Sequence, residues 1–194
     1  MDKYGTTPTC HDMFLDIKQV KGRLLTQDEM VESVVRDLKC ASALGLTVMR
    51  CIVNTPPEVL AKCVPFAEQY DVKMCIEIHS PWHVDHPWMM RMLETFQKFG
   101  PSHLGFIPDM GIFTKRYPRV MRDRFLRQGA DEKFVTYVCE AYEAGVLSEY
   151  IIGNVYAMGG KPIDLQMAEQ ARHMVYSNPR RLLDIMPYIR RYAK

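Results

Sequence analysis

The sequence contains no long apolar run, and none of its apolar stretches approaches the ~20 residues that a membrane-spanning helix needs. The opening residues MDKYGTTPTC also lack the basic and apolar regions of a signal peptide. A hydrophobic content of 47% with 25% charged residues is ordinary for a globular domain. We therefore expect a cytoplasmic protein that does not interact with membranes.

Cysteine pairs of the C-x-x-C type are absent as well. The six cysteines lie far apart, and several fall in apolar segments, where a thiol behaves as a small hydrophobic side chain. This spacing argues against a cysteine metal centre and favours a reduced compartment.

The sequence also has little excess charge of either sign, with 25 Lys and Arg against 23 Asp and Glu. The resulting net charge of +2 provides no electrostatic argument for a nucleic-acid partner. Residues 115–127 are locally basic, but Asp123 and the acids that follow offset this charge. We interpret this segment as the solvated face of a helix.

What the sequence does contain is an alternation of helical and strand patterns between residues 26 and 109. Thr26 with Glu29 three residues later forms a capping box, and apolar residues at helical spacing follow until Gly45. Apolar, β-branched runs separate the helical segments. The predicted helices cover 26–44, 55–70 and 87–99, and the predicted strands cover 46–53, 72–79 and 104–109. This order is typical of βα units in a parallel sheet.

The flanking segments follow other patterns. Residues 1–25 show no sustained period and are predicted to be a loop. Residues 147–155 fit a helix or a short strand, and 188–194 fit the opening of another strand. Further helices are predicted over 117–127, 131–145, 164–176 and 177–185. Because no repeat or linker interrupts the chain, we expect one domain.

Two acidic residues, Glu77 and Asp109, stand at the ends of predicted strands. A carboxylate in a buried strand is costly unless it is paired or bound to a metal. Ligands of parallel α/β folds bind at the carboxyl ends of the strands. Glu77 and Asp109 are therefore candidate metal- or substrate-binding residues. The alternatives are an ion pair between Glu77 and Arg50, and a loop-capping role for Asp109.

The number of predicted strands bounds the fold. Three strands, with one or two more at most, cannot close an eight-stranded parallel barrel, for which ~250 residues are typical. An open sheet leaves unpaired backbone groups at its edges. The fold is therefore either a small open α/β sandwich or a portion of a larger barrel. We favour the portion of a larger barrel. The predicted fold class is α/β, a partial parallel (β/α) barrel of the TIM type. Residues 1–194 are expected to form one such domain, truncated at both ends.

Three segments, LGLTVMRCIVNTPPE, FAEQYDVKMCIEIHSPWHVDHPW and LGFIPDMGIF, resemble the xylose-isomerase-like barrels of the sugar phosphate isomerase/epimerase superfamily. More narrowly, the Glu-Ile-His-Ser-Pro motif and the His-rich loop after it resemble C-glycoside deglycosidase catalytic (alpha) subunits. The resemblance implies a sugar isomerase or lyase that abstracts the proton alpha to a sugar carbonyl. It also implies a sugar or glycoside substrate, with a small beta-type partner subunit or a homo-oligomer as the assembly.

The same resemblance assigns roles to individual residues. Glu77 and Asp109 become ligands of a divalent metal, with Mn²⁺ favoured by oxygen ligands and Mg²⁺ or Zn²⁺ as alternatives. His79 becomes the catalytic base, and it lies on the side of Glu77 if the strand continues to it. We identify no counterpart of the superfamily's later His and Glu ligands in this sequence.

Arg50, Trp82 and His83 are candidate substrate-binding residues. Arg50 lies mid-strand, where a charge is costly unless paired, so it either lines the barrel mouth or pairs with Glu77 or another acid. Trp82 can stack on a sugar ring or an aromatic aglycone, but packing over the sheet explains it about as well. The His spacing in the loop of His83 does not match a helical metal pair, so capping or solvent exposure is the alternative to substrate contact.

One function is favoured by these observations, and two others are its alternatives. The first is a metal-dependent carbohydrate enzyme of the sugar isomerase/epimerase type, with C-glycoside deglycosidation as its narrower form. The second is a catalytically incomplete barrel that acts by binding a partner subunit. The third, an endonuclease acting at abasic DNA sites, needs metal-binding histidines and a basic groove, which we do not find. We expect no nucleic-acid partner.

Overall fold

The computed structural model describes residues 2–189 and divides into two compact units. Of the described residues, the sheet unit contains 2–78, Val84–Asp109 and 180–189. The helical unit contains His79–His83 and Met110–Pro179. The expectation of a single barrel domain over 1–194 stays a prediction.

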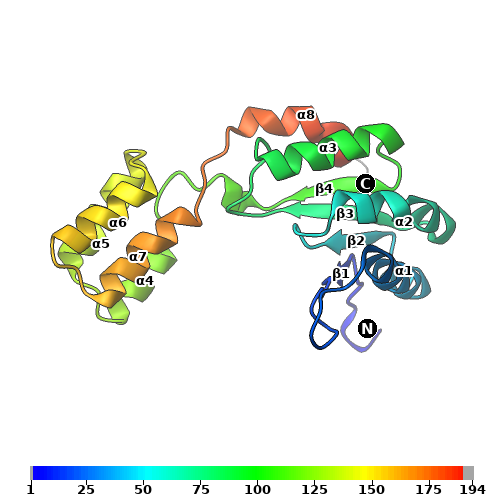
Figure 1. Cartoon of the computed structure of the whole chain (residues 1–194), viewed down its shortest axis with the longest axis horizontal. Coiled ribbons are helices and arrows are strands. Elements are labelled where there is room, and N and C mark those ends of the chain that lie inside the picture. The colour runs from blue at the N-terminus through cyan, green and yellow to red at the C-terminus, as the bar shows by residue number, and fades with distance from the viewer. Residues whose placement is uncertain (1, 190–194) are drawn as a thin grey trace. The chain divides into compact units, whose positions relative to one another are not determined.

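The sheet unit repeats the predicted order of helices and strands (Figure 1). Its strands are β1 (His11–Met13), β2 (Val48–Cys51), β3 (Lys73–Ile78) and β4 (Leu104–Pro108). Its helices are α1 (Gln27–Ala43), α2 (Pro57–Tyr70), α3 (Pro87–Phe99) and α8 (Leu182–Ile189). The six elements predicted between residues 26 and 109 are therefore confirmed. The loop predicted over 1–25 is wrong where β1 forms, because three residues are too few to show a period of two.

All four strands are parallel and lie in the order β1-β2-β3-β4. Right-handed crossovers between sequential parallel strands place the connecting helices α1, α2 and α3 on one face of the sheet. Contacts agree at both edges: His11 of β1 bonds to Asp37 of α1 at 2.9 Å, and Phe106 of β4 stacks on Phe96 of α3. The prediction of an α/β fold with a parallel sheet is confirmed, whereas closure into a barrel stays a prediction.

The helix-covered face of the sheet forms the core. Met49, Ile76 and Phe106 point to this face by register, and each is buried. The residues between them, such as Arg50 and Glu77, point to the opposite face. The alternation therefore separates an apolar, helix-covered face from a face that carries charge.

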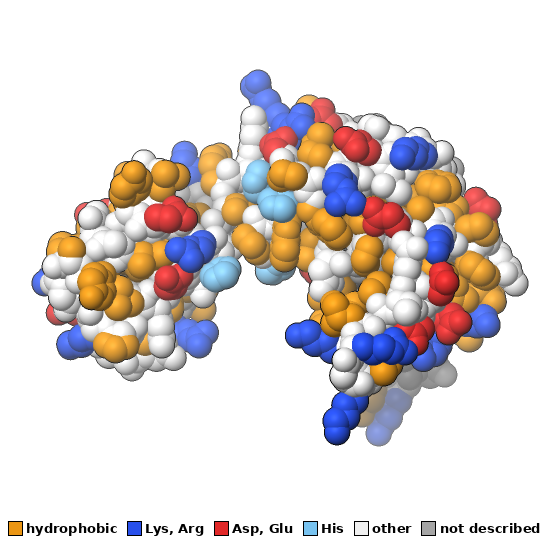
Figure 2. Space-filling view, in the orientation of Figure 1, with side chains coloured by type: hydrophobic (Ala, Val, Ile, Leu, Met, Phe, Trp, Pro, Cys, Tyr) orange, Lys and Arg blue, Asp and Glu red, His pale blue; other side chains and the backbone are white. Residues whose placement is uncertain are grey.

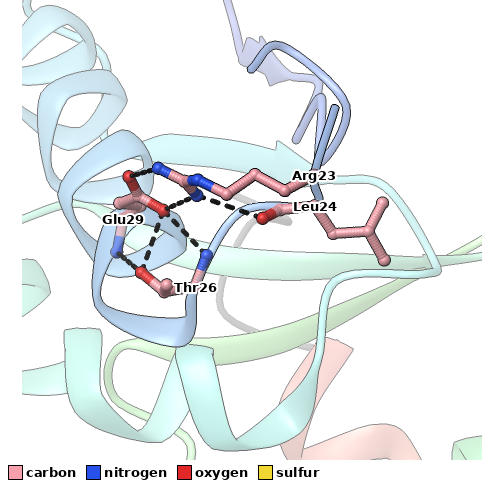
Figure 3. A network of polar contacts seen from close by, with 4 residues as sticks. All are labelled: Arg23, Leu24, Thr26 and Glu29. Atoms are coloured by element: carbon pink, nitrogen blue, oxygen red, sulfur yellow. Dashed lines mark hydrogen bonds and ion pairs between the residues drawn. The ribbon is translucent and has the colours of Figure 1, made fainter. Parts of the chain in front are cut away.

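Figure 3 shows how α1 begins. The hydroxyl of Thr26 accepts from the Glu29 amide, and the Glu29 carboxylate accepts from the Thr26 amide at 2.8 Å. Arg23 adds two bonds of 2.7 Å to the same carboxylate. This confirms the predicted capping box, which satisfies amides that a helix start leaves without intrahelical partners.

The cap makes folding stability depend on pH in an acidic window. Hydrogen bonding to Arg23, followed by the bonds to Thr26, lowers the pKa of Glu29 from 4.5 to about 2. A carboxyl group whose pKa is lower in the folded state stabilises that state above its unfolded pKa. We therefore expect the stability difference between wild type and Glu29→Gln to be full at pH 7 and to vanish as the pH falls from 4.5 towards 2. Urea unfolding at several pH values measures it, with Glu32→Gln, which removes an exposed acid from the same helix, as the matched control.

The helical unit contains α4 (Arg119–Arg127), α5 (Glu132–Glu143), α6 (Ser148–Ala157) and α7 (Pro162–Arg172). Short 3-10 helices in the chain cover Asp2–Tyr4, Met110–Ile112 and Pro179–Arg181. The ambiguous residues 147–155 form helix α6, whose Ile151 and Val155 are fully buried. Residues 173–176 leave the predicted helix, and Tyr176 instead forms an antiparallel bridge with Phe113.

The chain's last predicted strand is only partly testable. Tyr188 and Ile189 lie in helix α8, so the strand prediction is wrong for them, while residues 190–194 lie outside the described residues. Tyr188 packs its ring beside Phe96 and Phe106, with centroids 6.0 and 5.9 Å away. Packing on these aromatic rings therefore favours the helix over a strand.

Surface properties agree with the composition. Within residues 2–189, no helix is both long enough and apolar enough to cross a bilayer. Figure 2 shows acidic and basic side chains interspersed on the visible surface of both units. In the predicted basic segment, Asp123 pairs with Arg119 and Arg122, and the bond to Arg122 is the main cause of a lowered pKa of Asp123.

Candidate functional site

The charged face of the sheet brings together three charged residues. Two of them, Arg50 and Glu77, are predicted site residues, and the third, Asp12, is not. Arg50 lies opposite Asp12 on β1 and opposite Cys75 on β3. Glu77 lies two residues beyond Cys75, so its side chain points to the same face. The register therefore aligns Asp12, Arg50 and Glu77 across three neighbouring strands.

Arg50 bridges the two acids. It donates from Nε and Nη2 to the Asp12 carboxylate at 2.7 and 3.1 Å, and from Nη1 to Oε1 of Glu77 at 2.6 Å. The bonds to Asp12 are the main cause of a raised pKa of Arg50. The Glu77 side chain is 18% exposed, whereas that of Asp12 is 68% exposed. Solvent therefore screens the Arg50–Asp12 pair more strongly than the Arg50–Glu77 pair.

The pairing of Arg50 with Glu77, one of the predicted alternatives, is confirmed. The second partner, Asp12, was not predicted, because β1 is too short to be recognised as a strand. The only indication of Asp12 in the sequence was indirect. A mid-strand arginine such as Arg50 needs acids beside it, and one of these acids lies on a strand that was not identified. A role of Arg50 in substrate binding stays a prediction.

Asp109 follows β4 at the same end of the sheet. Its amide donates to the Ile78 carbonyl at 3.0 Å, which continues the β3–β4 ladder by one residue. Glu77 lies opposite Ile107, and Asp109 is two residues further along. The register thus assigns Asp109 to the face of Glu77, on the adjacent strand, where it is half-buried. Roles of the two acids in metal binding stay predictions.

The other three predicted site residues lie in the helical unit. Strand β3 ends at Ile78, so the alternation used to orient His79 stops one residue before it. His79 is exposed and donates from Nδ1 to the Ser80 carbonyl at 2.6 Å. The amide of Trp82 donates to the His79 carbonyl at 3.0 Å, which forms a turn that leads to His83. Trp82 and His83 are half-buried, and the functional roles of these three residues stay predictions.

Two further residues of the same sequence motif serve the sheet unit. His86 caps α3, because its Nδ1 accepts from the Trp88 amide at 3.2 Å. The Trp88 indole donates to the Val53 carbonyl at 2.8 Å, and Arg91 lies over its ring. Capping by a loop histidine, one predicted alternative to ligand binding, is confirmed for His86.

The side chains of this site can be compared with the ligands that a divalent metal prefers. Among residues 2–189, no three His, Cys, Asp or Glu side chains gather closely enough to hold an ion. Glu77 and Asp109 supply the hard oxygen ligands that Mn²⁺ or Mg²⁺ prefers. Arg50 donates to Oε1 rather than Oε2 of Glu77. The residues therefore fit part of an oxygen-rich ligand set.

The chain thus has a parallel α/β sheet with acids at the carboxyl ends of adjacent strands, which is where parallel α/β folds bind their ligands. The chain is 40% identical over 96 residues to the 3'-dehydrocarminate deglycosidase alpha subunit of Microbacterium sp. These 96 residues are 50% of this chain and 28% of that protein. It is 26% identical over 164 residues to the C-glycoside deglycosidase alpha subunit of Microbacterium trichothecenolyticum, covering 84% of this chain and 42% of that protein. A C-glycoside deglycosidase alpha subunit of Arthrobacter globiformis is 34% identical over 110 residues, which is 56% of this chain and 31% of that protein.

These similarities are local. The chain spans less than half the length of the curated relatives it matches, between 28% and 42% for the three named here. No family profile matches the chain. The resemblance to deglycosidase alpha subunits is therefore supported by relatives, and membership of the xylose-isomerase-like superfamily stays a prediction.

Proposed function

We propose that this chain forms part of the carbohydrate site of a metal-dependent C-glycoside deglycosidase. The observation that carries the proposal is the position of Glu77 and Asp109 at one end, and on one face, of two adjacent strands. The names of the relatives support a C-glycoside substrate. The proposed reaction begins with removal of the proton alpha to a sugar carbonyl.

In this proposal Glu77 and Asp109 hold a divalent cation, with Mn²⁺ preferred and Mg²⁺ or Zn²⁺ as alternatives. The bound ion would supply Lewis-acid chemistry toward the sugar oxygens. Arg50 is a positioning residue, because its bonds to Asp12 and Glu77 restrict the rotamers of the Glu77 carboxylate. His79 remains the proposed base, since an imidazole can accept and return a proton near neutral pH. Trp82 and His83 remain the proposed contacts to the glycoside.

The subunit naming of the relatives supports a partner. Because they are called alpha subunits, we propose that a second, different subunit completes the working assembly. The rival proposal is that this chain binds its partner without catalysing a reaction itself. Metal binding separates the two proposals, because only the first requires Glu77 and Asp109 to hold an ion.

The test is calorimetric titration of the metal-stripped chain with MnCl₂. We expect one saturable site, weakened at least ~10-fold in Glu77→Ala and in Asp109→Ala, because each change removes a proposed ligand. Glu94→Ala, which removes an exposed acid from α3, is the matched control and should bind like wild type. Turnover of 3'-dehydrocarminate, with and without Mn²⁺, is the second readout. Equal manganese affinity in all four proteins would refute the proposed metal site.

A further inference from the structure

A pocket of about 510 Å³ lies within the helical unit, apart from the acids of the sheet. The ends of α5 and α7, the start of α6 and the segments around residues 115 and 176 line it. Nothing in the proposed function uses these residues. Their chemistry combines two aromatic rings, an apolar floor and two cations.

One wall of the pocket is held rigidly. The Tyr142 hydroxyl donates to the Thr114 carbonyl, and its ring meets that of Tyr117 edge-on, with centroids 6.0 Å apart. Burial raises the pKa of Tyr142, so its hydroxyl remains protonated and adds no negative charge at neutral pH. Tyr142 therefore offers a preorganised aromatic surface.

A second part of the lining comes from two chain segments that are joined by backbone bonds. The Thr114 amide donates to the Val175 carbonyl at 3.2 Å, and Phe113 bridges Tyr176. These bonds place Lys115 beside the strand-like segment that carries Tyr176. Tyr176 is 56% exposed although it lines a pocket, so its ring is available for stacking.

The floor of the pocket is apolar. Ile151 and Ala171 are buried beneath it, and Val146 and Leu147 line it while remaining 39% and 63% exposed. Covering exposed apolar side chains with a flat apolar ligand removes apolar surface from water, and this burial stabilises the complex. The floor thus favours a ligand with a hydrophobic ring.

The charge of the lining favours an anion. Lys115 and Arg172 contribute two positive charges against the single acid Glu143. Arg172 approaches Glu169 only at 3.5 Å, between side chains that are both about half exposed. Within residues 2–189, no hydrogen bond or ion pair engages the Lys115 side chain, so its charge is available to a ligand.

We propose that this pocket binds a planar aromatic anion of the aromatic carboxylate class. Tyr142 and Tyr176 would face the ring, the apolar floor would cover its edge, and Lys115 would pair with the carboxylate. The site is additional to the carbohydrate site and does not depend on metal binding.

The test is a calorimetric titration of the full chain with 2-naphthoate at low salt. At about -0.3 kcal/mol for each of its roughly 13 non-hydrogen atoms, 2-naphthoate should bind with a Kd on the order of 1 mM. Lys115→Gln should weaken binding roughly fivefold, because it removes one exposed charge pair. Tyr176→Ala should weaken binding of both 2-naphthoate and the neutral 2-naphthamide, because it removes the stacking surface.

Lys133→Gln is the matched control, because Lys133 is an exposed lysine of α5 that does not line the pocket. It should bind 2-naphthoate like wild type, and 2-naphthamide should not distinguish Lys115→Gln from wild type. Circular dichroism confirms that each variant is folded. The absence of saturable binding would overturn the proposal, as would equal 2-naphthoate affinity in the two lysine variants.

Discussion

Replacing Phe96 by alanine is expected to lower the free energy of unfolding of the sheet unit by about 4 kcal/mol. Phe96 is fully buried on α3, and its ring stacks on Phe106 with centroids 4.8 Å apart. Tyr188 of α8 packs against both rings. The substitution therefore removes an aromatic side chain and leaves a cavity where α3, β4 and α8 meet, and both losses destabilise the fold.

The same helix supplies the matched control for this prediction. Phe99 lies three residues further along α3 and is 45% exposed. Phe99→Ala should therefore cost well below half as much, because little apolar surface returns to water. Urea unfolding followed by circular dichroism, with hydrogen exchange at the amides of β3 and β4, measures both variants. A similar cost for the two would show that α3 does not pack on the sheet as described.

The elements of the sheet unit were predictable because local signals and packing agree there. The capping box at Thr26, the apolar spacing along α1 and the stop at Gly45 all favour the helix that the structure contains. β3 is buried at five of its six positions, which explains why all its residues except Lys73 and Glu77 are apolar. β1 escaped prediction, because its three residues are recognisable only once β2 is seen to pair with them.

The candidate site was predictable in part for a similar reason. Glu77 is the last residue but one of β3 and Asp109 directly follows β4, so their placement depends only on strand ends and alternation. The link through Arg50 to Asp12 spans 38 residues of sequence and depends on the register between β1 and β2. The orientation of His79 depended on a strand predicted to reach it, and β3 ends one residue earlier, at Ile78.

The division into two units was not predicted, although the local helices of the second unit largely were. Tyr176 leaves its predicted helix because the segment after α7 pairs with residues 112–114 instead. This pairing joins residues more than 60 positions apart, and a propensity-based prediction does not see such contacts. Asp164 makes a comparable connection inside the helical unit, across 33 positions.

Asp164→Ala should destabilise the helical unit by roughly 3 kcal/mol. Asp164 is 1% exposed, and its two carboxylate oxygens accept from the amides of Asp131 and Lys161, each at 2.8 Å. Asp131 caps α5 and Lys161 precedes α7, so one carboxylate satisfies the starts of two helices. Alanine would leave both part-buried amides without their acceptor, and each unsatisfied amide costs about 1–3 kcal/mol.

Asparagine at position 164 distinguishes the contribution of the hydrogen bonds to stability from the contribution of side-chain size. Asp164→Asn keeps one oxygen acceptor and turns the other group into a donor, so it should lose roughly half as much stability as alanine. Glu169→Gln on the same helix removes an exposed acid whose ion pair with Arg172 is 3.5 Å long, and it should change stability by less than about 0.5 kcal/mol. Urea unfolding gives the three values, and hydrogen exchange at the amides of residues 131 and 161 shows whether protection is lost where the carboxylate was removed. An alanine variant as stable as the Glu169→Gln control would mean that water replaces the carboxylate at both helix starts, and that Asp164 does not join α5 to α7.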